Sequence, residues 1–293
     1  MLYSQIAKII LPIIIIALIG FIFGKLKKTE LKSMADFIIY IASPALAITQ
    51  LSMQHMTIPE IFSISMSAAL IILGLGAIAW LLFKITKTAV PNGIYLPIMF
   101  MNSGYIGYPL VLFAFGGEGL SKAIIFNMTN AILVFSVGIY IISQGKDRWQ
   151  FLKVPFIYAA VLGILLSLTG LKLPPFIYAP LYLLGATTIP LAIFMLGSSL
   201  AKTKINSLKL PLLASVLRIG LGFCLGLLAV FLLRLQGVTA NMVILLSSLA
   251  SGLMPIAISE EYDRDSDLIA STIALSTLIS VATIILILKW LTI

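Results

Sequence analysis

The sequence predicts an all-α membrane protein whose ten transmembrane helices form two inverted five-helix repeats. Three observations lead to this prediction: an apolar composition, ten long apolar windows, and a similarity between the two halves of the chain. Of the 293 residues, 61% are apolar and only 10% are charged, and the mean hydropathy is +1.15. A soluble domain carries about 25% charged residues. This chain lacks the polar surface of a water-soluble fold, so we expect it to lie in a lipid bilayer.

The apolar windows set the expected number of spans. A helix that crosses a bilayer takes about 20 apolar residues. Ten such windows, each bounded by charged residues or by turns rich in Gly, Pro and Asn, lie at 4–24, 33–53, 60–83, 92–115, 120–143, 153–169, 175–200, 208–233, 238–259 and 267–290. We interpret the first as a span and not as a signal peptide, because Lys25, Lys27 and Lys28 follow it in place of a small-residue cleavage site.

The distribution of positive charge predicts the orientation. Most of the 19 Lys and Arg residues lie in alternate loops, after the odd-numbered windows. The positive-inside rule places these loops in the cytoplasm, which makes the chain a multi-pass protein of the plasma (inner) membrane with both termini outside. The loop at 260–267 is acidic, but acidic residues contribute little to topology. Because the basic residues are scattered singly, orientation also explains the net charge of +9, and we expect no nucleic-acid partner.

An internal repeat is visible at an offset of 146 residues. This offset aligns Gly24 with Gly170, Pro44 with Pro190, Gly74 with Gly220, Gly76 with Gly222, and Pro109 with Pro255. It divides the chain into a first repeat at 1–146 and a second at 147–293. Five helices are an odd number, so the second repeat must enter the membrane inverted relative to the first. Inverted repeats of this kind are typical of secondary transporters.

Two windows at matching positions are expected to be broken in mid-span. In 92–115 the residues Gly104 and Gly107 precede Pro109, and in 238–259 Gly252 precedes Pro255. Proline removes an amide donor and glycine permits non-helical dihedrals, so each window should split into two half-helices that cross near the midplane. The N-terminus of a half-helix carries partial positive charge, which favours an anion at the crossing. The two prolines would hold this crossing.

The residues at these breaks resemble a known family. The stretch from Asn102 to Leu110 resembles the Asn-Thr-Gly-x-x-Gly-x-Pro-Leu pattern of the auxin efflux carrier family, which includes plant auxin exporters and bacterial malate and malonate permeases. A second match starts with the Gly-x-x-Pro at Gly252 and continues to Ser271 through Ala257 and the Glu-Glu-Tyr that ends at Tyr262.

The resemblance implies a fold and a mode of action. The fold is that of sodium/proton antiporters and bile acid symporters, within the superfamily of bile, arsenite and riboflavin transporters. Helices 1, 2, 6 and 7 (about 4–53 and 153–200) would form a scaffold, and helices 3–5 and 8–10 (about 60–143 and 208–290) a transport unit. The unit would move by an elevator mechanism of alternating access. The family also implies a homodimer formed through the scaffold, with an organic carboxylate bound at the crossover Asn.

The candidate substrate-binding residues cluster at the two breaks. Asn102 is the first choice, and Arg218 is the one ionisable residue well inside a span. Arg218 either binds a substrate carboxylate, neutralises a local cluster of carbonyls, or extends to the membrane surface. The other candidates are Ser103, Gly104, Tyr105, Gly107, Ser251 and Gly252 at the breaks, and Ser43 and Thr188 on the scaffold side. For Ser43 and Thr188, a role in helix packing is an equal alternative.

The coupling ion stays open at this stage. No Asp or Glu lies at the centre of a window, whereas proton relays in membranes usually use such carboxylates. Apart from Glu60 at its start and Lys84 just after its end, the window at 60–83 also lacks the acidic and basic residues that the third helix of plant auxin carriers bears. Coupling to Na⁺ or H⁺ is therefore possible but not indicated, and sodium could be held by carbonyls and hydroxyls at the breaks.

These observations predict a secondary active or facilitative transporter of small organic anions, such as malate, malonate or auxin-like acids. The alternative is a sodium-coupled organic-anion symporter of the bile-acid type, and a non-transporting receptor with the same fold stays open. An enzyme is not expected, because the sequence has no His-Glu-x-x-His pattern and its single histidine, His55, lies in a loop. We expect neither a cofactor nor a bound metal.

Overall fold

The computed structural model describes residues 2–27, 31–145, 149–203 and 208–291, and within them the chain is helical with one isolated β-bridge. The sequence-based boundary at 146, together with Lys28, lies outside the described residues. In chain order the elements are α1 (Leu2–Leu26), α2 (Leu31–Phe37), η1 (Ile38–Ala42), α3 (Ser43–Ser52), α4 (Ile58–Ile85), η2 (Asn92–Ile94), α5 (Tyr95–Met99), α6 (Gly107–Leu133), η3 (Val134–Gly138), α7 (Ile139–Ile142), η4 (Gln150–Lys153), α8 (Pro155–Thr169), α9 (Pro175–Ala186), α10 (Thr188–Lys202), α11 (Lys209–Leu232), α12 (Gly237–Ser247), α13 (Met254–Glu261) and α14 (Ser266–Trp290).

Seven helical stretches in the described part of the chain are long and apolar enough to cross a membrane. They are Ile6–Leu26, Leu31–Ser52, Ile58–Ile85, Gly107–Ile142, Pro175–Lys202, Lys209–Leu232 and Ser266–Trp290. Three of the ten expected windows contain no uninterrupted helix of this length. The window at 153–169 holds the 15-residue helix α8, and those at 92–115 and 238–259 are each interrupted.

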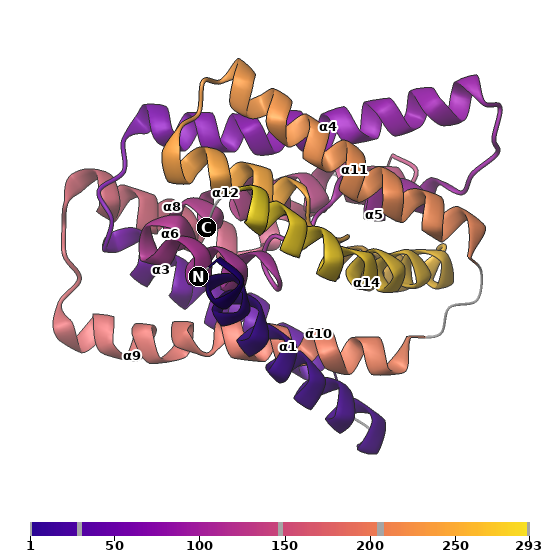
Figure 1. Cartoon of the computed structure of the whole chain (residues 1–293). Helices are drawn as coiled ribbons and strands as arrows, with labels where there is room; N and C mark the ends of the chain where they lie inside the picture. Colours follow the sequence, from indigo (N-terminus) through magenta and orange to yellow (C-terminus); the bar gives the residue numbers. More distant parts are fainter. Residues whose placement is uncertain (1, 28–30, 146–148, 204–207, 292–293) are drawn as a thin grey trace.

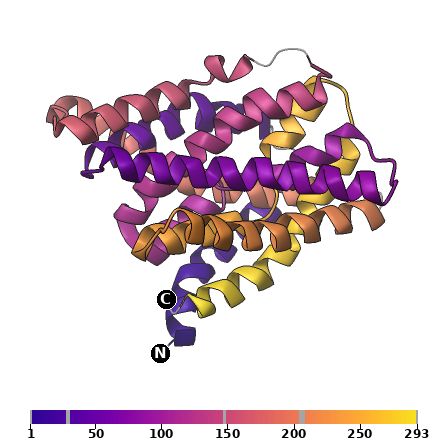
Figure 2. The ribbon, with the colours of Figure 1, turned by 90° about the horizontal axis from the view of Figure 1, so that it is seen from above.

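The helices pack in two groups (Figures 1 and 2). In the first group α1 runs along α10, and α3 packs against α8 and α9. The α1 and α10 backbones approach so closely that a Cβ atom on Gly20 or Gly197 would collide with a carbonyl oxygen of the facing helix. In the second group α4, α6, α11, α12 and α14 pack against one another. In Figure 1, α4 and α11 lie along the top of the molecule and α9 and α10 along the bottom.

Two local features shape the second group. Helix α6 contains a kink at Gly116, whose φ of 66° and ψ of −161° are open to glycine and strained for other residues. Lys122, just after this kink, joins three helices through its ammonium group. The Lys122 Nζ atom lies 2.9 Å from Glu60 Oε1 and 2.7 Å from Glu118 Oε1, and it donates to Thr239 Oγ1 at 3.0 Å. The lysine thereby links α4, α6 and α12.

Candidate functional site

The two interrupted windows meet each other in space. Helix α5 ends at Met99 and α6 begins at Gly107, while α12 ends at Ser247 and α13 begins at Met254. Between these ends, Met101 and Ser251 form an isolated antiparallel bridge. The Asn102 N–H donates to the Ala250 carbonyl at 2.9 Å, and the Gly252 N–H donates to the Phe100 carbonyl at 2.9 Å. Each interruption thus supplies hydrogen-bond partners to the backbone of the other, which unwound segments at membrane depth require.

The two prolines lie just after these interruptions. Pro109 is the third residue of α6, and Pro255 is the second residue of α13. Proline is tolerated in the first turn of a helix because the N–H groups there have no intrahelical partner. Each proline therefore belongs to the start of the second half-helix, whereas Gly104 and Gly252 lie in the unwound segments themselves.

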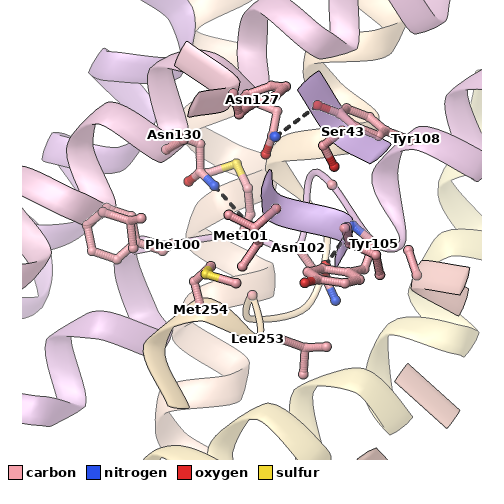
Figure 3. A pocket seen from close by; sticks show the side chains of 18 of the residues that line it. Ser43, Phe100, Met101, Asn102, Tyr105, Tyr108, Asn127, Asn130, Leu253 and Met254 are labelled. Carbon is pink, nitrogen blue, oxygen red and sulfur yellow. Dashed lines mark hydrogen bonds between the residues drawn. The ribbon is translucent and has the colours of Figure 1, made fainter. Parts of the chain in front are cut away.

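A cavity lies beside the meeting point of the two interruptions (Figure 3). About 750 Å³ of empty space lies in it and at its mouth, part of it open to solvent. Seven of the residues expected from the sequence line it: Ser43, Asn102, Gly104, Tyr105, Thr188, Gly252 and Pro255. They come from the interruptions and from α3, α10 and α13. The cavity therefore brings together residues that are far apart in the sequence.

Four buried polar atoms around this cavity have no hydrogen-bond partner among the described residues. They are Asn102 Nδ2, Tyr105 OH, Asn130 Oδ1 and Thr188 Oγ1, and all four side chains line the cavity. A buried polar atom without a partner costs about 1–3 kcal/mol, and such atoms are rare in native structures. Four of them around one cavity are typical of a polar site that takes up water or a polar ligand.

The surrounding hydrogen bonds orient these groups. The Tyr105 N–H donates to Asn102 Oδ1 at 3.2 Å. This bond orients the side-chain amide of Asn102 and leaves its Nδ2 group without a partner among the described residues. Asn130 Nδ2 donates to the Met101 carbonyl at 3.3 Å, which joins α6 to the unwound backbone of the first interruption. Asn127 accepts from Ser103 Oγ at 2.7 Å and donates to the Tyr108 hydroxyl at 2.9 Å. Figure 3 shows Asn102, Tyr105, Tyr108, Asn127 and Asn130 around the cavity.

Five of the expected residues do not line the cavity, and four of them have clear contacts elsewhere. Ser103 bonds to Asn127, Gly107 packs closely against Leu246, and Pro109 is buried in the first turn of α6. Ser251 Oγ donates to the Pro97 carbonyl at 2.6 Å, and the Ser251 N–H donates to Ser276 Oγ at 3.1 Å. The bond from Ser251 Oγ joins the second interruption to α5.

Arg218 is the fifth of these residues. Its side chain is fully buried in α11, and its guanidinium donates to the carbonyls of Ile98, Met99, Ser247 and Leu249. Of the three alternatives that the sequence left open, this arrangement corresponds to the one in which arginine neutralises a cluster of carbonyls.

The apolar wall of the cavity was not anticipated from the sequence. Ile38 and Ile39 belong to the π-helical segment η1, and Val134 and Phe135 to the π-helical segment η3. The π-helix is rare and often marks functional sites, but it has no compositional signal of its own. Phe100 also lines the cavity, and its ring packs against Gly138, a position where a Cβ atom would lie 2.9 Å from Phe100 Cε2.

Comparison with known proteins extends over the whole chain. Residues 5–151 and 144–288 match the model of a family described as membrane transport protein. An uncharacterized transporter of Methanocaldococcus jannaschii is 30% identical, over 95% of this chain and 96% of that protein. An uncharacterized transporter of Methanothermobacter thermautotrophicus is 26% identical, over 97% of this chain and 98% of that protein. The chain therefore belongs to the membrane transport protein family, the auxin efflux carriers, as the residues at the two interruptions had indicated.

Proposed function

We propose that this chain is a secondary active or facilitative transporter that moves small organic anions through the membrane by an elevator mechanism. The observation that carries the proposal is the set of four unpartnered polar atoms in the cavity where the two interrupted helices meet. The ten-span inverted repeat is part of the proposal. Of the three windows without a long helix, one holds α8, and the other two hold the interruptions between α5 and α6 and between α12 and α13. This agrees with a repeat whose fourth helix is broken in each half.

The cavity favours an anion for two reasons. The first turns of α6 and α13 contribute Tyr108, Met254 and Pro255 to its lining, so the partial positive charge of two helix N-termini is directed at it. The free Asn102 Nδ2 group is a donor, and the hydroxyls of Tyr105 and Thr188 donate when an acceptor is present. A carboxylate has two oxygens that accept such bonds.

The rest of the lining favours one class of carboxylate. The lining is mostly apolar, with Phe100, Phe135 and Phe156 among its larger side chains, and the described residues that form it include no Lys, Arg, Asp or Glu. A second carboxylate would be buried here without a compensating charge, which is costly. The cavity therefore suits a monocarboxylate with an apolar body better than malate or malonate. Asn130 Oδ1 offers an acceptor for a donor group on that body.

The position of the cavity supports alternating access. Ser43, Val154, Phe156 and Thr188 line it from the proposed scaffold at 4–53 and 153–200. The facing residues come from 100–108, 127–135 and 252–255, in the proposed transport unit at 60–143 and 208–290. Movement of one unit against the other would carry the site from one side of the membrane to the other. The homodimer, the plasma membrane location and the external termini stay predictions from the family and from the charge distribution.

Thermal shift with the purified protein tests the anion site. We expect monocarboxylates with apolar bodies to raise the unfolding temperature of the wild type, and to raise it less in the Asn102→Ala variant. Equal stabilisation of both proteins would contradict the site, and preferential stabilisation by dicarboxylates would contradict the proposed substrate class. Counterflow in proteoliposomes then separates a carrier from a non-transporting receptor. Uptake that requires sodium would favour the bile-acid type of symporter.

A further inference from the structure

Arg218 bonds to a set of carbonyls that belong to both interruptions. The Nη1 group donates to Ile98 O at 3.2 Å and to Met99 O at 3.1 Å, at the C-terminal end of α5. The Nε group donates to Leu249 O at 3.3 Å, and Nη2 donates to Ser247 O, at the C-terminal end of α12. Every hydrogen-bond partner of this guanidinium in the described part of the chain is a backbone carbonyl.

These carbonyls need a donor because their helices stop. In a continuous helix, Ile98 O would accept from the N–H of residue 102 and Ser247 O from that of residue 251. Here the Asn102 N–H donates to Ala250 O and the Ser251 N–H donates to Ser276 Oγ. The interruptions thus leave carbonyl oxygens from two helix ends around one point, and Arg218 lies at that point.

The charges at this point balance without a further ion. A helix C-terminus carries up to about half a negative charge, so two of them together amount to about one. The guanidinium supplies one positive charge. Because Arg218 has no carboxylate partner among the described residues, its charge is available to compensate the two helix ends.

The packing of α11 leaves room for the guanidinium. Gly222 lies one turn after Arg218, and a Cβ atom at Gly222 would collide with Ser247 O and with the Arg218 guanidinium. The position 146 residues before Arg218 is Ile72, which is fully buried in α4. One cation therefore compensates the helix ends of both halves.

We propose that Arg218 is the resident cation of a carbonyl-lined site, and that removal of its side chain leaves a site for a small monovalent cation. Unwound carbonyls and half-helix C-terminal ends are the groups with which broken helices coordinate sodium in transporters. In this chain the guanidinium already bonds to those oxygens. If the chain acts as the transporter proposed above, its cycle needs no co-transported metal cation such as sodium.

Thermal unfolding of the full-length protein in nanodiscs tests the site directly. The probes are guanidinium, sodium and potassium chlorides, compared with choline chloride at equal ionic strength and well below denaturing concentrations. We expect Arg218→Ala to unfold at a lower temperature than the wild type, and to be stabilised by at least one of the three small cations in a saturable manner. The wild type, and the exposed-site control Arg234→Ala, should respond to no cation more than to choline.

Two further variants separate charge from volume. Arg218→Lys keeps a positive charge and Arg218→Met fills similar space without one, so the lysine variant should retain more stability than the methionine variant. Equal stability of these two variants would overturn the proposal. If Arg218→Ala does not fold, the comparison of the lysine and methionine variants tests the proposal in its place. An absence of cation stabilisation in a folded Arg218→Ala variant would overturn it as well, as would sodium-specific stabilisation of the wild type.

A transport measurement keeps this proposal distinct from the proposed function. Counterflow by the wild type should proceed at the same rate when sodium is replaced by choline, and a requirement for sodium would overturn the cation-free cycle. An absence of counterflow under all conditions would instead contradict the transporter function. In that case the stability measurements still decide whether Arg218 is the resident cation.

Discussion

The two interruptions have the same backbone role and different side-chain roles. In the first, Asn102 and Tyr105 each present an unpartnered polar atom to the cavity. The residues 146 positions later are Ser248 and Ser251, whose hydroxyls donate to Ile244 O and Pro97 O, both at 2.6 Å. The first interruption therefore provides the groups that are free to bind a ligand, and the second provides groups that stabilise the crossing.

The largest expected effect concerns glycines that lie beside the two crossing helix ends. Gly222→Ala should destabilise the protein by about 3 kcal/mol, at the upper end of the range for overpacking, because the new methyl group meets the Ser247 carbonyl and the Arg218 guanidinium. Gly76→Ala, at the matching position of the first half, should lose less stability, because its methyl group meets the flexible end of the Met99 side chain at 2.8 Å. Chemical denaturation measures both. The control is Gly220→Ala, where the added Cβ has no neighbour within 4 Å, and a loss as large as that of Gly222→Ala would contradict the reasoning.

The next effect separates ligand binding from structure. Asn102→Ala should weaken binding of a stabilising monocarboxylate by about 2 kcal/mol, or roughly thirtyfold, because it removes a hydrogen bond to a charged group. Ser248→Ala, at the matching position, should leave the affinity unchanged because its hydroxyl bonds within its own helix. Isothermal titration of the two variants measures this difference. Equal losses in both would mean that the second interruption also binds the ligand.

Substitutions at the matching positions Tyr105 and Ser251 should affect different quantities, ligand affinity for Tyr105 and protein stability for Ser251. Tyr105→Phe removes a hydroxyl that has no partner in the described protein, so it should weaken ligand binding by about 1 kcal/mol without loss of stability. Ser251→Ala removes the bond to Pro97 O, so it should lower stability by about 1 kcal/mol without a change in affinity. Unfolding and titration measured on both variants provide the comparison. A stability loss in Tyr105→Phe would show that its hydroxyl has a structural partner.

The smallest expected effect tests the contribution of α10 to ligand binding. Thr188→Val keeps the shape of the side chain and removes the hydroxyl that faces the cavity, so affinity should fall by about 0.5–1 kcal/mol. Ser198 on the same helix also has a buried, unpartnered hydroxyl, but it does not line the cavity. Ser198→Ala should therefore leave the affinity unchanged. If both variants bind like the wild type, Thr188 has only a packing role.

Some of this site was predictable because its signals are local. Glycine and proline alter the backbone in any surroundings, so the interruptions at 100–106 and 248–253 follow from the composition of the two windows. Asn102 was singled out by its place at the first break and by the family resemblance of the residues around it. Apolar composition alone did not reveal that helix α8, with its 15 residues, is shorter than the uninterrupted helical stretches of the other windows.

Other parts of the site depend on packing that a single sequence does not reveal. A hydroxyl in an apolar helix faces either a carbonyl or a cavity, and the rotation of the helix decides between them. Ser251 was the stronger candidate because it lies at a break, and Thr188 the weaker one, yet only Thr188 lines the cavity. Arg218 was ambiguous for the same reason, because its role depends on the ends of two helices that are distant in the sequence. The π-helical segments consist mostly of ordinary apolar residues, so the composition of the sequence does not mark them.

The bond between Arg218 and Ile98 has a consequence for biogenesis. The two residues are 120 positions apart in the chain. At a synthesis rate of about 5–20 residues per second, Ile98 leaves the ribosome roughly ten seconds before Arg218 does. During that time the carbonyls at the end of α5 lack the guanidinium that compensates them in the finished protein. The first half of the molecule can therefore complete its broken helix only after α11 has entered the bilayer.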